Sequence, residues 1–386
     1  MKILKTIAVL AALSMASSAF AEVKVKAFNK LSSDIVELEH SGDETTNTFP
    51  GFKNKIKAEI LTDHLDAMVE GVFKITDFTN ENDYVVAWDG AVSDWYVEAR
   101  VLDDLLTLGY HDNINPEGTY LPVYDDNVGT GNIGSDGFTL VLRPVEGLRL
   151  GFSVPFTDDT SLVTYDVETG TVGVNEDFGG NILVMDGETK EGCPDIWKYP
   201  NLRLGAIYNM GIAEFGVAAH DFLDSKQRSI GFYVYSAGLF GQVKGIDFRA
   251  GFAHSWGKVA LGDKPFYKGK DITGENFWNV SFEISEIIPF SLAVEAAGNT
   301  NSDDSAYDFY TGLKLGFGIN EQLSLDVIAG AELDLSDENA KKAMLHGKAA
   351  LDYNVTKLDT VEVAVDYNKC DEKWNMKFPV SWKHKF

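Results

Sequence analysis

The sequence predicts an all-β protein, a transmembrane antiparallel up-and-down β-barrel of about 16–18 strands with short turns at one end and long loops at the other. Three observations predict this fold. Short segments of alternating apolar and polar residues follow one another along the chain, and side chains with a period of two lie on opposite faces of a strand. Short and long connections between these segments alternate. The last segment ends the chain on an aromatic residue, Phe386.

The N-terminal residues have the pattern of a secretory signal peptide, which we expect to cover residues 1–21. Two lysines precede an apolar segment, residues 7–15, that is too short to span a bilayer. A small-x-small sequence follows, so we expect cleavage after Ala21. The mature chain, residues 22–386, is then a single transmembrane β-barrel domain. No later stretch is long and apolar enough to be a transmembrane helix.

Composition and cysteine spacing exclude several classes of function. The formal net charge of −26 argues against a nucleic-acid partner, because phosphates require lysine and arginine. An aromatic content of 12% argues against disorder. Whether Cys193 and Cys370 form a disulfide in an oxidising compartment stays open. No CxxC or Cys/His spacing indicates zinc, and we expect neither a metal nor a cofactor.

The strand segments come mostly in pairs joined by short turns. A first strand lies within residues 23–39, and a count of eighteen follows, with sixteen as the alternative. The remaining segments, in chain order, are 55–60 with 65–75, 95–101 with 106–110, 138–142 with 148–156, 202–208 with 213–219, 230–243 with 246–252, 278–284 with 290–296, 309–317 with 323–331, 345–353 with 361–367, and 374–386.

The two longest connections, residues 111–137 and 157–200, are rich in Asp, Asn and Gly. Alternation of short turns with long loops is typical of membrane barrels. A barrel of this size would leave a hole too wide for side chains to fill, since about eight strands is the filled size. We therefore expect the apolar face to contact lipid and the polar face to line a wet lumen.

The end of the chain resembles the C-terminal strand of bacterial outer-membrane β-barrels. Phe378, Trp382 and Phe386 are the residues that carry this resemblance. It implies an outer-membrane location and an assembly signal that the barrel-assembly machinery reads. In size and loop plan the chain resembles the general porins. That resemblance implies contact with outer-membrane lipid and a homotrimer.

General porins fold their third external loop into the lumen as a constriction, and residues 111–137 have a suitable length. This candidate constriction loop contains Pro116-Glu117-Gly118, similar to the start of the porin loop motif, although the rest of that motif is absent. We expect acidic loop residues to face basic residues of the wall across a narrow opening. The predicted set is Glu117, Asp125 and Asp126 on the loop and Lys57, Arg100, Arg143, Arg149 and Arg203 on the wall.

The expected function is a water-filled channel for passive diffusion of small hydrophilic solutes and ions. We expect no enzyme activity, because no GxSxG or HExxH motif occurs. Two alternatives stay open. One is a substrate-selective channel in which residues 22–50 form an N-terminal plug. The other is a structural or adhesive barrel whose external loop, residues 157–200, binds a partner.

Overall fold

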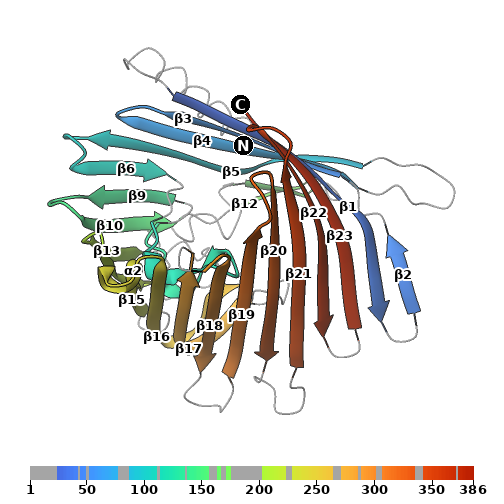
Figure 1. Ribbon diagram of the computed structural model, residues 1–386. Helices are drawn as coiled ribbons and strands as arrows, with labels where there is room; N and C mark the ends of the chain where they lie inside the picture. The colour runs from blue at the N-terminus through green and yellow to red at the C-terminus, as the bar shows by residue number, and fades with distance from the viewer. Residues whose placement is uncertain are drawn as a thin grey trace.

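The wall strands of the protein join into one closed antiparallel barrel, seen in the computed structural model of Figure 1. The barrel has eighteen wall strands, so the larger of the two predicted numbers is confirmed. The structure describes residues 24–41, 44–48, 52–76, 87–110, 114–134, 137–155, 163–166, 171–174, 202–222, 228–263, 271–285, 288–300, 307–334, 342–370 and 373–386.

Each wall strand pairs with its neighbours in chain order. The strands are β1 (Lys24–Ser41), β3 (Phe52–Leu61), β4 (Leu65–Thr76), β5 (Ala87–Val101), β6 (Leu106–Tyr110), β9 (Gly137–Leu142), β10 (Leu148–Pro155), β13 (Arg203–Asn209), β14 (Ala213–His220), β15 (Ser229–Ser236), β16 (Ile246–Asp263), β17 (Asp271–Ile284), β18 (Ser291–Thr300), β19 (Tyr307–Gly318), β20 (Leu323–Asp334), β21 (Lys342–Asn354), β22 (Asp359–Cys370) and β23 (Lys373–Lys385).

The remaining elements are short. Strand β2 (Glu44–Thr48) continues the line of β3, because β1 pairs with β2 along its C-terminal part and with β3 along its N-terminal part. Helical turns occur at η1 (Glu117–Thr119), η2 (Gly129–Gly131) and α2 (Gly238–Gly241). Two small hairpins pair β7 (Tyr120–Leu121) with β8 (Asp126–Asn127) and β11 (Val163–Asp166) with β12 (Thr171–Val174). Within the described residues, no helix is long and apolar enough to cross a membrane.

The first and last strands close the barrel. Strand β1 pairs with β23 from Phe28 opposite Lys385 to His40 opposite Trp374, and the blue and red strands lie side by side in Figure 1. The N–H of Phe386 also donates to the carbonyl oxygen of Ala27 at 2.9 Å. The predicted N-terminal plug is therefore wrong for the described part of residues 22–50. Strand β1 belongs to the wall, because its backbone groups pair with β23 on one side and with β2 and β3 on the other.

Apolar side chains alternate outward and polar side chains inward along the strands. Phe138, Phe232 and Val363 expose 60%, 57% and 50% of their surface. Inward-facing Glu214 and Glu295 are each only 1% exposed. An apolar outer belt and a polar interior are the pattern of a barrel that stands in lipid, where backbone groups find partners only within the closed sheet.

The turn after β15 departs from the prediction, which extended that strand to Val243. The strand ends at Ser236, and α2 follows. Gly238 and Gly241 adopt φ values of +56° and +71°, which break the extended backbone. The side chain of Asp247 accepts a hydrogen bond from the N–H of Gly238 at 2.9 Å and holds this turn in place. The other predicted strand pairs correspond to wall strands.

Candidate channel constriction

The described part of the β6–β9 connection, residues 114–134, lies against the inside of the barrel; we call it the inner loop. Its side chains Leu121 and Val128 pack with Phe277 of β17 and Tyr310 of β19. Phe277 is fully buried, whereas Phe282 on the opposite face of the same strand is 45% exposed. The loop therefore covers the inward face of β17. Figure 1 shows it inside the ring of strands.

A buried carboxylate on β18 holds the tip of the inner loop. Glu295 Oε2 accepts a hydrogen bond from the N–H of Val123 at 2.6 Å, and Oε1 accepts one from the N–H of Tyr124 at 2.8 Å. The hydroxyl of Tyr310 donates to Oε1 at 2.5 Å. Three donors thus converge on this one buried side chain. Glu295 therefore acts as a polar anchor of the tip.

A second carboxylate holds the start of the inner loop. Glu214 of β14 accepts a hydrogen bond from the N–H of Glu117 at 2.7 Å. Its other oxygen accepts from Arg149 at 3.3 Å and from Asn209 at 3.2 Å. The two anchors lie on strands β14 and β18, so the loop is attached to the wall at two separated places.

Small residues let the loop backbone approach the wall closely. A Cβ on Gly118 would lie 2.7 Å from the nitrogen and 2.8 Å from the oxygen of Val234. A Cβ on Gly216 would lie 2.5 Å from the ring of Pro116. The amide of Asn279 completes this contact by donating to the carbonyl oxygen of Gly118 at 2.8 Å. Glycine is needed at position 118 because the space for a side chain is occupied by backbone.

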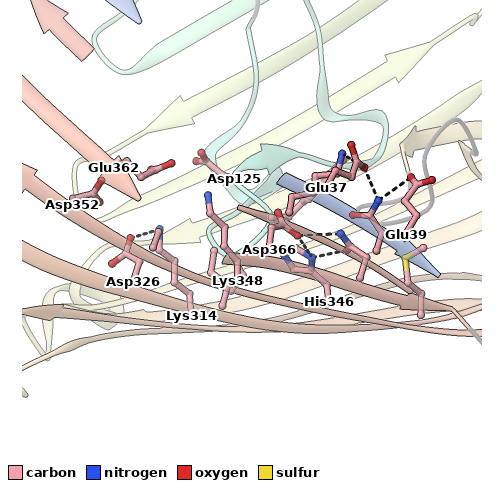
Figure 2. A pocket seen from close by; sticks show the side chains of 18 residues that line it. Glu37, Glu39, Asp125, Lys314, Asp326, His346, Lys348, Asp352, Glu362 and Asp366 are labelled. Atoms are coloured by element: carbon pink, nitrogen blue, oxygen red, sulfur yellow. Dashed lines mark hydrogen bonds and ion pairs between the residues drawn. The ribbon is translucent and has the colours of Figure 1, made fainter. Parts of the chain in front are cut away.

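A cavity of about 730 Å³ separates the loop tip from the opposite wall (Figure 2). This volume falls in the range of about 300–1,000 Å³ that is typical of small-molecule sites. Strands β1 and β19–β23 form the wall side. Seven carboxylates and three lysines line the cavity: Glu37, Glu39, Asp125, Asp326, Asp352, Glu362 and Asp366, with Lys314, Lys348 and Lys377.

The predicted basic residues engage partners away from this cavity. Arg100 pairs with Asp66 and Glu98, Arg143 with Thr107, Arg149 with Glu214, Lys57 with Glu59, and Arg203 with the carbonyl of Gly134. None of the five is among the described residues that line the cavity. Arg143 and Arg149 line a separate hollow at the short-turn end. The expected row of arginines across from Asp125 is therefore not assembled.

The predicted acidic residues of the loop occupy three different positions. Glu117 begins η1 and gives its N–H to Glu214. Asp126 pairs with Leu121 in the β7–β8 hairpin. Asp125 alone of the three lines the cavity, and it accepts a hydrogen bond from the hydroxyl of Tyr120 at 2.5 Å. Burial, followed by the hydrogen bond to Asp125, raises the pKa of Tyr120, so this hydroxyl stays a donor at physiological pH.

The predicted assembly-signal residues lie on the closing strand. Trp382 and Phe386 are 43% and 74% exposed, as outward-facing side chains should be. Phe378 shares their face by the alternation of the strand. Lys377 and Asn375, on the other face, line the cavity. The sequence pattern therefore predicted correctly which face of the last strand points to the lumen.

Other predicted chemistry falls partly outside the described residues. Cys370 ends β22, and its suggested partner Cys193 lies outside the described part of the chain. Most of the external loop at residues 157–200 also lies outside it, apart from the β11–β12 hairpin. The described residues contain no group of three or more His, Cys, Asp or Glu side chains placed to hold a metal ion.

The anchoring roles of Glu214 and Glu295 were not predicted from the sequence. In the alternation pattern these two residues look like any other inward-facing carboxylate. A usable signal was present in their surroundings, because inward positions on β13–β17 carry apolar or small residues such as Ile207, Ala218 and Phe277. Apolar residues on the wet face of a large barrel indicate that something covers them.

Comparison with solved structures matches the fold of the whole barrel. Pseudomonas aeruginosa OpdQ is 9% identical, with 96% of this chain and 99% of that chain covered and a TM-score of 0.55. Acinetobacter baumannii OccAB3 is 10% identical, with 94% and 100% covered and a TM-score of 0.53. The Pseudomonas aeruginosa outer membrane protein opdK is 11% identical, with 94% and 99% covered and a TM-score of 0.52.

These matches show a shared fold and no close sequence relationship, since the sequences are only 9–11% identical. No protein-family model matches the chain. No curated protein sequence matches it either. The chain therefore shares its barrel fold with these proteins over nearly its whole length.

Proposed function

We propose that this protein is an outer-membrane channel through which small hydrophilic solutes diffuse passively. The observation that carries the proposal is the polar cavity left between Asp125 of the inner loop and the wall strands β1 and β19–β23. A channel needs a wet passage and charges that sort solutes, and it needs no catalytic group. The apolar outer belt supports the membrane location. The fold shared with an outer membrane protein agrees with it.

The narrowing of the passage by the inner loop is part of this proposal. Anchors at Glu214 and Glu295 keep the loop against one side of the barrel. The passage then runs past Asp125 on the other side. A structure of OpdK was obtained with vanillate, and we keep a substrate-selective channel, without an N-terminal plug, as the second candidate.

Single-channel recording in a planar bilayer tests the channel function. Purified, folded protein should give stable conductance steps that scale with salt concentration, because the lumen is open to water. Saturable block by one solute would support the selective version. Folded barrels that insert but carry no current would contradict the proposal. A matched control is the same protein unfolded by boiling, which should give no steps.

We also propose export through the signal peptide at residues 1–21, assembly by the barrel-assembly machinery, and a homotrimer. The exposed aromatic face of β23 supports the assembly step, because Trp382 and Phe386 remain accessible at the end of the chain. Cross-linking of the protein in native membranes would reveal the oligomer. N-terminal sequencing of the mature protein would locate the cleavage site.

Deletion of Phe386 should reduce the amount of folded barrel in the outer membrane. Its side chain is 74% exposed, so the loss should act on assembly more than on the stability of the finished barrel. Its N–H also closes the β1–β23 seam. Immunoblotting of membrane fractions, with heat-modifiable mobility as the folding readout, measures the effect. Lys385→Ala, one position from the end, serves as the control, and equal loss in both variants would contradict a specific role of Phe386.

A further inference from the structure

The cavity has an uneven distribution of charge. Seven carboxylates and three lysines line it, so its lining carries four more negative than positive side chains. Two of the lysines are already committed to ion pairs. Lys377 lies 2.8 Å from Glu37, and Lys314 lies 3.6 Å from Asp326. Among the lysines of the lining, Lys348 is then the one that forms no ion pair with a described residue.

Two of these carboxylates oppose each other directly in the sheet. Asp352 of β21 is the cross-strand partner of Glu362 of β22. Like charges in directly opposite positions destabilise a sheet. The neighbouring strand β20 adds Asp326 to the same face of the wall. The carboxylates repel one another in the empty barrel. A cation that passes between them relieves this repulsion, so the wall attracts cations.

A fourth carboxylate, Asp125, belongs to the inner loop. Its side chain lies on the loop side of the cavity and faces Glu362 and Lys348 of the wall (Figure 2). The loop tip that carries it is held in place by Glu295. A solute in the passage therefore meets carboxylates on the loop side as well as on the wall side. Carboxylates therefore lie on both sides of the cavity.

We propose that the channel selects cationic over anionic small solutes, and that Asp125, Asp352 and Glu362 set this preference. The inference rests on the proposed channel function. Rings of acidic side chains favour cations in a pore, and a cleft of one sign raises the local concentration of the opposite ion. The class of solute is then a small monovalent cation or an organic amine without a carboxylate group.

Basic groups on the neighbouring strands offset only part of this charge. Lys30 of β1 acts electrostatically on Asp352. Lys55 is occupied by Glu70 at 2.7 Å, and Lys57 by Glu59 at 2.6 Å. Lys30 and Lys383 oppose each other across the β1–β23 seam, and neither lines the cavity among the described residues. They belong to the part of the wall near the chain ends. The preference at the cavity therefore depends mainly on its own lining, in which carboxylates outnumber lysines.

The test is the reversal potential of single channels in a KCl gradient, for the wild type and for the triple variant D125N/D352N/E362Q. The wild type should pass K⁺ in preference to Cl⁻. Each neutralised carboxylate should lower the permeability ratio by about two- to fivefold, as expected for a unit charge a few ångströms from the path in water. The preference should also shrink as the salt rises from about 0.1 M to 1 M, because the screening length falls from roughly 10 Å to 3 Å.

E321Q is the matched control, since Glu321 is exposed in the β19–β20 turn and lies outside the cavity lining. It should keep the wild-type ratio. Replacing KCl with choline chloride tests the organic cation, which should still carry current in the wild type and less in the triple variant. A wild type that prefers Cl⁻, or a triple variant with an unchanged ratio, would overturn the inference and leave the channel function standing. Folded protein without any conductance would overturn the channel function itself.

Discussion

Glu295→Ala should widen the passage and make its current noisier, because it releases the tip of the inner loop. The variant removes the acceptor for the N–H groups of Val123 and Tyr124 and for the hydroxyl of Tyr310. Each buried donor left without an acceptor costs about 1–3 kcal/mol. Without this anchor, the tip that carries Asp125 is free to leave the wall of β18. Single-channel recording should show larger conductance and more frequent fluctuations than in the wild type.

The size of the side chain can be separated from its hydrogen bonding. Glu295→Gln keeps the volume and retains one acceptor oxygen, so its effect should lie between the wild type and Glu295→Ala. Glu321→Ala, in an exposed turn, removes a carboxylate without touching the loop and should leave the conductance unchanged. A Glu295→Ala channel with wild-type conductance and noise would show that the tip is held by its apolar packing alone.

The wall of the barrel could be predicted because its signal is local. Alternation with period two decides which side chains share a face, and it needs no knowledge of the partner strand. The predicted end of β15 was wrong, because the same local signal continues past the true end of the strand. Val243 continues an apolar pattern, but Gly238 and Gly241 carry positive φ values that turn the chain out of the strand. The closing of β1 onto β23 was also predicted, because a sheet in lipid cannot keep an open edge. Alternation does not give the register of that pairing, which joins the two ends of the chain.

The site was less predictable, because facing the lumen does not say where along or around it a side chain lies. Arg149 and Arg203 were correctly expected to point inward. The inner loop covers their part of the wall, so they meet Glu214 and the carbonyl of Gly134. The side chain of Asp125 points instead into the cavity that β19–β23 line. Only the route of the loop decides which charges meet, and that route depends on contacts such as those of Glu295 that link distant strands.

Gly118→Val should displace the start of the inner loop from the wall. Its Cβ would lie 2.7 Å from the nitrogen of Val234 and 2.9 Å from the Cβ of Tyr233. The nitrogen belongs to the backbone of β15, which is fixed in the sheet between β14 and β16. The loop must therefore move, and overpacking of this kind costs about 1–3 kcal/mol. The hydrogen bond from Asn279 to Gly118 should be lost with the movement.

The measurable consequences are a lower thermal unfolding midpoint of the barrel and a conductance that differs from the wild type. Gly318→Val is the matched control, since nothing lies within 4 Å of a Cβ at that position. It adds the same side chain at a glycine of the wall strand β19 and should leave the conductance unchanged. Because Gly118 lies near the Glu214 anchor and Glu295 holds the tip, the two loop variants should be roughly additive in unfolding free energy. Equal behaviour of Gly118→Val and Gly318→Val would mean that the inner loop does not rest on β15, and the passage would then have to be sought elsewhere in the lumen.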